Sequence, residues 1–295
     1  MTRFFFKFAP VALAVAMAAS NLAAAEQAAK QKFQGLLSEA SLALLKEGNA
    51  RFVADKPRHP NAGSVRRAAT AAEGQEPFVT VLACSDSRAP VEMIFDRGIG
   101  EVFAVRVAGN VADTDEIATI EYGVGHLQTP LLLVLGHTRC GAVTAVVKGV
   151  ELHGSLPKLV DNIKPAAERA KAATQDEKEI IPAAIKENVW QSINDILRHS
   201  EIIRGELARG NVIVVGGVYD LDTGKVEWLG EHPAQKAILT ATPTGGDPHA
   251  AGPKSDAHTP EPSKAKPVDA NAPVKAAVPT SKVHAKAATS PNAGH

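Results

Sequence analysis

Two short stretches, far apart in the chain, carry the residue types of a metal site. The first is Cys84-Ser85-Asp86-Ser87-Arg88 and the second is His137-Thr138-Arg139-Cys140. Two thiolates and one imidazole form a three-ligand zinc set that leaves a fourth position open for water or substrate. The pattern therefore predicts a catalytic zinc site on Cys84, His137 and Cys140.

The charged residues beside Cys84 suit a second role in such a site. Asp86 can accept a hydrogen bond from a zinc-bound hydroxide, which turns the oxygen lone pair toward the substrate. Arg88 can keep that carboxylate ionised through charge-assisted, bidentate hydrogen bonds. An ordinary salt bridge within a loop is the alternative. The position next to a metal ligand favours the catalytic interpretation, because perturbed titratable groups cluster at functional sites.

A disulfide competes with zinc as the explanation for the two cysteines. Cys84 and Cys140 are the whole cysteine content of the 295-residue chain, and an even count in an oxidising compartment can indicate a disulfide. A disulfide would require neither His137 nor the Asp86/Arg88 pair. The sequence therefore favours zinc, and a bound metal would also protect the thiolates from oxidation.

Both motifs follow apolar runs that end in turn residues. Such runs indicate buried strands, and open α/β sheets build their sites at the carboxyl ends of parallel strands. The expected fold class is α/β, with a central sheet of four parallel strands plus an antiparallel edge strand, flanked by helices and preceded by an N-terminal helical extension. The expected strands are Phe78–Ala83, Val102–Val107, Leu131–Leu135, Val212–Val218 and Lys225–Leu229.

Apolar spacing and caps place the first helices. Glu26–Phe52 has leucines at near-helical spacing and is interrupted near its end by Gly48-Asn49; this helix either covers its own domain or packs on another subunit. Arg51–Gly74 is polar and is expected to be an extended connector. Asp113 can cap a helix over Thr114–His126, with Glu116 as its reciprocal partner.

Further along, one turn and one long helical region are expected. The small residues Ala108-Gly109-Asn110 allow the backbone to approach a site closely. Ser155–Arg209 is helical in character and is divided by prolines. The dividing prolines are Pro157, Pro165 and Pro182, and the apolar stripe is Ile185, Val189, Ile193, Ile196 and Ile203.

The two ends of the chain are expected to lie outside the folded domain. Residues 1–25 have the layout of a cleaved secretory signal, with Arg3 and Lys7, the apolar run Ala9–Ala19 and small residues before Glu26. An uncleaved membrane anchor is the alternative, although the run is short for a membrane span. The domain is expected over 26–242, and 243–295 is expected to be a disordered Pro/Ala/Lys-rich tail. A bacterial periplasm is the predicted compartment.

Composition excludes some partners. The chain has a formal net charge of zero and is 45% hydrophobic. It therefore offers no basic excess to neutralise nucleic-acid phosphates or an anionic membrane surface. We expect no nucleic-acid partner and, after signal cleavage, no membrane partner.

Cys-Ser-Asp-Ser-Arg followed by His-x-x-Cys-Gly resembles the β-class carbonic anhydrases. The resemblance runs from about Leu36 to Leu229 and includes Lys46-Glu47-Gly48-Asn49-Ala50-Arg51-Phe52 and Val105-Arg106-Val107-Ala108-Gly109-Asn110. Together with the signal layout of residues 1–25, which lies outside the resemblance, it identifies the chain as an exported bacterial member of that family.

The resemblance implies zinc-dependent, reversible hydration of carbon dioxide to bicarbonate and a proton, in a homodimer or homotetramer. It also implies that Asp86 can move onto zinc as a fourth ligand. Some members couple this closure to a bicarbonate pocket with Trp three residues before the first cysteine; Val81 stands there, so that regulation is predicted to be absent.

Three other functions stay open at this stage. A hydrolase of carbonyl sulfide or carbon disulfide would keep the site and change the substrate. A non-catalytic, zinc-stabilised assembly protein would need no open metal position. A dithiol-disulfide protein is disfavoured because Cys84 and Cys140 are not a C-x-x-C pair.

Overall fold

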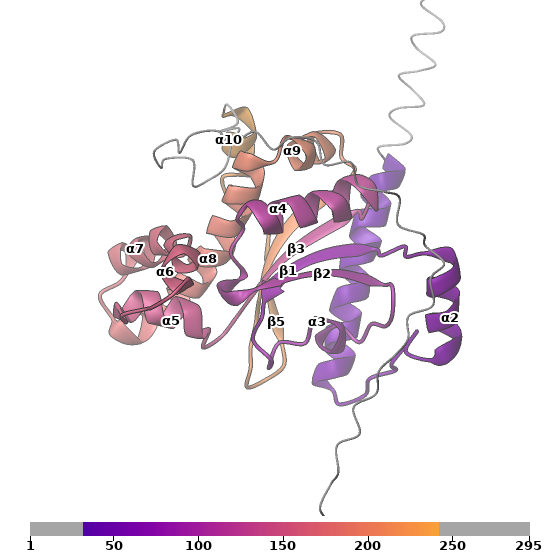
Figure 1. The fold of residues 1–295 in the computed structure, drawn as a ribbon, viewed down its shortest axis with the longest axis horizontal. Helices are drawn as coiled ribbons and strands as arrows, with labels where there is room; N and C mark the ends of the chain where they lie inside the picture. The colour runs from indigo at the N-terminus through magenta and orange to yellow at the C-terminus, as the bar shows by residue number, and fades with distance from the viewer. Residues whose placement is uncertain (1–31, 242–295) are drawn as a thin grey trace, which may run out of the picture. The chain divides into compact units, whose positions relative to one another are not determined.

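A computed structural model describes residues 32–241, which form a five-stranded sheet between helices (Figure 1). The strand order is β2-β1-β3-β4-β5. The first four strands run parallel, and β5 pairs antiparallel with β4. The expected fold class is therefore confirmed. The strands are β1 (Val79–Cys84), β2 (Val102–Val107), β3 (Leu131–His137), β4 (Ile213–Tyr219) and β5 (Val226–Gly230).

Helices cover both faces of the sheet. The long helix α8 (Glu177–His199) packs on β3 and β4 at one face, and the N-terminal helix, residues 32–53, packs through Leu45 on the other. The remaining elements are α2 (Ser64–Glu73), α3 (Val91–Ile94), the 3₁₀ turn η1 (Ala108–Asn110), α4 (Thr114–Glu121), the π-turn η2 (Tyr122–His126), α5 (Gly141–Lys148), α6 (Leu156–Asp161), α7 (Lys164–Ala173), α9 (Glu201–Ala208) and α10 (Gln235–Thr240).

The alternation of side chains along β1 decides which core receives each residue. Every residue of β1 is buried, as expected for a strand covered on both faces. Val81 and Ala83 lie in the core that contains Leu45, whereas Leu82 and Cys84 lie in the core that contains α8. Cys84 therefore ends the strand on the α8 side of the sheet.

The structure confirms the expected capped helix and corrects the expected connector. The Asp113–Glu116 capping box is present, and the helix that it starts continues past Glu121 as the π-turn η2. The expected connector over Arg51–Gly74 is wrong in part, because its Ala- and Arg-rich second half forms α2, and these residue types favour helix.

Pro182 does not divide the helical region as expected. It lies inside α8, which continues because its following apolar stripe is buried against the sheet. The division falls instead at Ser200, whose side chain caps α9 by accepting a hydrogen bond from the backbone N–H of Ile203.

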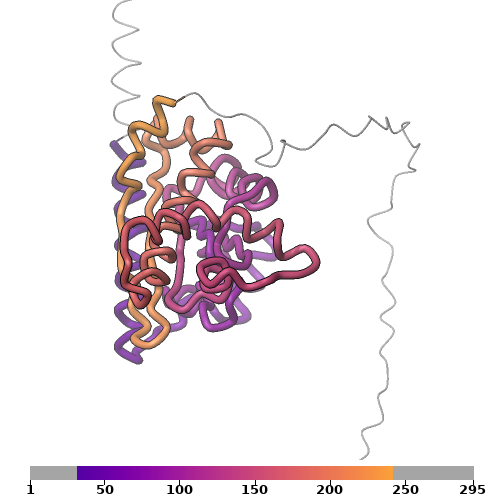
Figure 2. Tube along the Cα trace, turned by 90° about the vertical axis from the view of Figure 1, so that its left-hand side faces the viewer, coloured from indigo at the N-terminus to yellow at the C-terminus, as the bar shows by residue number. Residues whose placement is uncertain are grey.

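The expected interruption at Gly48-Asn49 is also wrong: the N-terminal helix continues through both residues. A Cβ atom at Gly48 would stand 1.8 Å from the carbonyl oxygen of Phe95. Asn49 donates to the carbonyl of Gly224 at 2.9 Å and accepts from the N–H of Val226 at 3.0 Å. Gly48 thus lets the helix approach Phe95, and Asn49 docks the helix beside β5 (Figure 2).

Gly48→Ala is expected to lower the free energy of unfolding by about 3 kcal/mol, because the helix must move away from Phe95 to admit one methyl group. Urea unfolding measures this. Gly35→Ala in the same helix is the matched control, since no atom lies within 4 Å of its added Cβ; alanine should stabilise there. Equal unfolding midpoints for the two variants would contradict this account.

The expected signal over 1–25, the tail over 243–295 and the first residues of the N-terminal helix lie outside the described residues. Within 32–241, no helix combines the length and the apolar character needed to cross a bilayer.

Candidate metal centre

Three elements bring the predicted ligands together. Cys84 is the last residue of β1, His137 is the last residue of β3, and Cys140 precedes the first turn of α5. β1 and β3 are adjacent parallel strands, so their carboxyl ends meet. The two sulfur atoms and one imidazole nitrogen all lie within 4.8 Å of one another, and all three residues are buried.

The imidazole of His137 has a free, buried nitrogen that suits a metal ligand. Its Nδ1 lies 2.9 Å from the carbonyl oxygen of Thr138. A carbonyl can only accept, so Nδ1 carries the proton and Nε2 presents its lone pair. Nε2 is buried and has no hydrogen-bond partner. Such an orphaned acceptor beside two thiols fits a zinc ion, because a metal-bound histidine donates its other N–H to a neighbouring acceptor in this way.

The two thiols share one proton. The hydrogen bond from the Cys140 thiol, aided by the N–H of Gly109 at 3.2 Å, lowers the pKa of Cys84 to about 4 although burial opposes this. The same contact with Cys84, together with burial, raises the pKa of Cys140. A divalent cation would displace the shared proton and take both residues as thiolates.

Asp86 and Arg88 form the expected pair. Arg88 donates from Nε to Oδ1 at 2.9 Å and from a terminal nitrogen to Oδ2 at 2.7 Å, and its backbone N–H also donates to Oδ1. These bonds, with Arg88 as the main cause, hold the pKa of Asp86 far below its usual range.

The same pair lies against the ligand set. Asp86 Oδ2 is 3.8 Å from His137 Nε2, and the Asp86 side chain is 18% exposed. The three-residue cluster does not include Asp86. Its second expected role, as a zinc ligand, stays a prediction.

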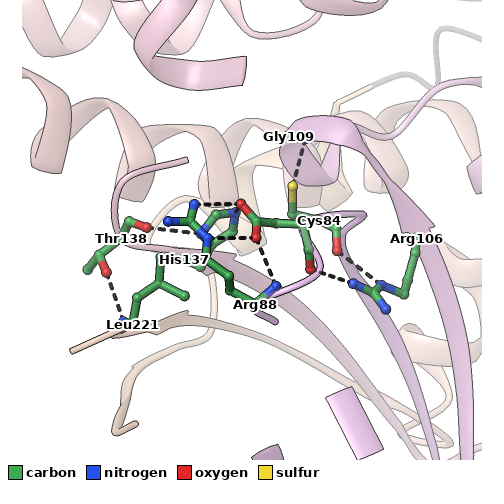
Figure 3. Close-up of polar contacts among 8 residues, drawn as sticks. Cys84, Arg88, Arg106, Gly109, His137, Thr138 and Leu221 are labelled. Carbon is green, nitrogen blue, oxygen red and sulfur yellow. Dashed lines mark hydrogen bonds and ion pairs between the residues drawn. The ribbon is translucent and has the colours of Figure 1, made fainter. Parts of the chain in front are cut away.

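Arg106 has a structural role that the sequence motif did not reveal. Its guanidinium donates to the carbonyl of Cys84 at 3.1 Å and to the carbonyl of Asp86 at 2.7 Å (Figure 3). Arg106 stands on β2 opposite Ala83, one residue before the motif. Strand pairing was the signal that could have predicted this contact.

The loop between His137 and Cys140 is held from the β4–β5 turn. Thr138 Oγ1 accepts from the N–H of Leu221 at 3.0 Å, and Arg139 donates to Asp222 at 2.6 Å. Arg139 adopts a left-handed φ of 56°. These contacts fix a short loop that has to place two ligands three residues apart around one point.

Known proteins match this chain in sequence and in fold. A family model described as "Carbonic anhydrase" matches residues 79–226. Carbonic anhydrase 2 of Mycobacterium tuberculosis is 38% identical over 183 residues, which cover 61% of this chain and 87% of that protein. The carbonic anhydrase of Mycolicibacterium smegmatis is 38% identical over 191 residues, which cover 62% of this chain and 89% of that protein.

Solved structures agree. The β-carbonic anhydrase CafA of Aspergillus fumigatus superposes with a TM-score of 0.52 at 30% identity, covering 68% of this chain and 96% of that one. A tetrameric β-carbonic anhydrase of Sordaria macrospora gives a TM-score of 0.52 at 29% identity, covering 57% and 87%. The family match over residues 79–226 spans β1 to β4, both cysteines and the histidine, and the chain belongs to the β-carbonic anhydrase family.

Proposed function

We propose that this enzyme uses zinc, the cofactor of its family, to convert carbon dioxide and water reversibly into bicarbonate and a proton. One observation carries the proposal: buried Cys84, His137 and Cys140 converge with an unpartnered imidazole nitrogen, in a chain of this family. Zinc held there supplies the Lewis acidity that makes water a nucleophile at moderate pH.

The residues around the metal position the reactants. Asp86 is ionised and can only accept, so it receives the O–H of the nucleophilic water and turns the oxygen lone pair toward carbon dioxide. Arg88 fixes the direction of that carboxylate through two parallel bonds. Arg106 holds the backbone on both sides of Asp86. The site thus restricts the water to a reactive orientation.

Stopped-flow hydration of carbon dioxide, combined with metal analysis of the purified full chain, tests this function. We expect one zinc per chain and rapid hydration. Stoichiometric zinc without turnover would favour a non-catalytic assembly protein. Turnover of carbonyl sulfide or carbon disulfide without hydration would favour the related hydrolases. Joined cysteines in an active, zinc-free protein would indicate dithiol chemistry.

We further propose a homodimer or homotetramer. The N-terminal helix exposes several large apolar side chains, which favours burial against a second copy. The Sordaria macrospora relative is described as tetrameric. Light scattering during gel filtration measures the mass, and a monomer at micromolar concentration would contradict the proposal. The exposed side chains are Phe33, Leu36, Leu37 and Leu44.

Export to a bacterial periplasm is also proposed, on the residues of the N-terminus. Positive charge at Arg3 and Lys7 precedes an apolar run and the small residues Ala23-Ala24-Ala25. N-terminal sequencing of the protein recovered from the periplasmic fraction should begin at Glu26. Recovery of the uncleaved chain in the membrane fraction would support an anchor instead.

A further inference from the structure

We propose that Asn188 is a positioning residue of the metal centre. From α8 it holds the η1 turn so that the N–H of Gly109 donates to the sulfur of Cys84. This inference rests on the zinc site of the proposed function and extends it to a residue whose side chain bonds the η1 turn rather than the ligand cluster or Asp86.

Two buried polar side chains on α8 hold the turn. Asn188 Nδ2 donates to the carbonyl of Gly109 at 2.6 Å, and Ser192 Oγ donates to the carbonyl of Asn110 at 2.8 Å. Both residues are 1% exposed. They lie one helical turn apart, so a single helix face binds two successive carbonyls.

Stability alone does not account for Asn188. Its neighbours along this face, Ile185, Val189 and Ile193, are buried and apolar. The Oδ1 atom of Asn188 is buried with no hydrogen-bond partner. A buried, unpaired amide oxygen costs about 1–3 kcal/mol, which an apolar side chain would avoid. The amide is therefore better explained by its bond to the turn.

The turn is confined from its other side as well. Gly109 has a φ of 75°, which favours glycine. A Cβ atom there would lie 2.7 Å from Ile163 Cδ1 and 3.2 Å from the Cβ of Ala142. Packing and the Asn188 bond together direct the Gly109 N–H at the Cys84 sulfur, 3.2 Å away (Figure 3).

An N–H···S bond changes what the sulfur offers a metal. The donor lowers the energy of the sulfur lone pairs, which sets the energy of thiolate-to-metal charge transfer. It also holds the sulfur with its lone pairs directed at the metal, and we expect this positioning to decide the affinity. Outer contacts of this kind tune metal affinity and reactivity, and their loss typically lowers metal affinity about 10–100-fold. Asn188 acts through Gly109, because it holds the carbonyl group of the same residue whose N–H makes that bond.

The test replaces Asn188 with leucine, which has the same branching and the same number of side-chain heavy atoms but no donor. In the full chain, Asn188→Leu should bind zinc about 10–100-fold more weakly in competition with a chelator. In the cobalt-substituted protein, the thiolate-to-metal charge-transfer band should move to lower energy, because the unbonded sulfur is easier to oxidise. Wild-type affinity, or weaker affinity with an unmoved band, would overturn the proposal.

Two further variants separate this role from general destabilisation. Ser200→Ala also removes a buried hydroxyl, which donates to Glu121 at 2.6 Å and caps α9; it should lower stability and leave the zinc affinity and the cobalt band unchanged. If Asn188→Leu does not fold, Ser192→Ala is the second variant, because it removes the hydroxyl that binds the adjacent carbonyl of Asn110. This variant should also weaken zinc binding and move the cobalt band to lower energy, with smaller changes than those expected for Asn188→Leu. Unchanged readouts in a folded Ser192→Ala would then overturn the proposal.

These readouts do not depend on turnover. A wild-type protein that binds zinc but does not hydrate carbon dioxide would refute the proposed function. In that case the zinc competition and the cobalt spectrum would still show whether Asn188 positions the metal centre.

Discussion

Cys84→Ser is expected to remove zinc from the protein and to reduce carbon dioxide hydration by about 1,000-fold or more, since metal activation of water supplies most of the rate. A serine hydroxyl remains protonated where the Cys84 thiolate forms readily, given its pKa of about 4. Cys140 and His137 would be left as a two-ligand site that holds zinc weakly.

Ser85→Ala is the matched control for this substitution. Ser85 is the next residue along the chain, is exposed, and makes its contact with Val107 through its backbone N–H. The alanine variant should retain zinc and turnover. Metal analysis and stopped-flow assays measure both variants side by side. Full zinc occupancy and normal hydration in Cys84→Ser would remove the basis of the proposed function.

Asp86→Asn is expected to lower kcat by about 100-fold or more while zinc remains bound, because the amide no longer acts only as an acceptor toward the nucleophilic water. Arg88→Ala should act in the same direction, since it removes two bonds that aim the carboxylate. Zinc content together with kcat distinguishes this effect from loss of the metal.

The pH dependence follows from the direction of the Asp86 pKa shift. Arg88 holds this pKa far below its usual range, so the carboxylate is ionised at every assay pH above about 5. Removing Arg88 lets the pKa rise toward its ordinary value, which still leaves Asp86 ionised at neutral pH. The loss of activity in Arg88→Ala should therefore persist at alkaline pH, where protonation cannot explain it.

Arg209→Ala is the matched control for Arg88→Ala, because it breaks an exposed ion pair far from the site. Arg209 bonds Glu206 at 2.6 Å and is 52% exposed, against 54% for Arg88, and its loss should leave kcat unchanged. A crystal structure of the zinc enzyme above neutral pH supplies the second check. Asp86 bound to zinc in that wild-type structure would contradict both the orienting role and the predicted absence of bicarbonate regulation.

The N-terminal helix and α8 show where sequence patterns stop being informative. Gly48 would be a helix breaker by its local preference, yet the helix passes through it, because Phe95 lies against it from 47 residues further along the chain. Pro182 likewise stays inside α8 because the apolar face of α8 is buried on the sheet. In both cases tertiary packing outweighs propensity.

By itself, the sequence predicted the strands and the three candidate ligand residues, which the structure brings together. Apolar runs that end in turn residues predict buried strands. Cys84 and His137 are the last residues of two of these strands. Only the tertiary structure decided what surrounds the ligands: Arg106 on the Cys84 and Asp86 carbonyls, Asn188 on Gly109. These bonds join residues 20 to 79 positions apart, and such pairings depend on how strands and helices pack rather than on local patterns of residue type.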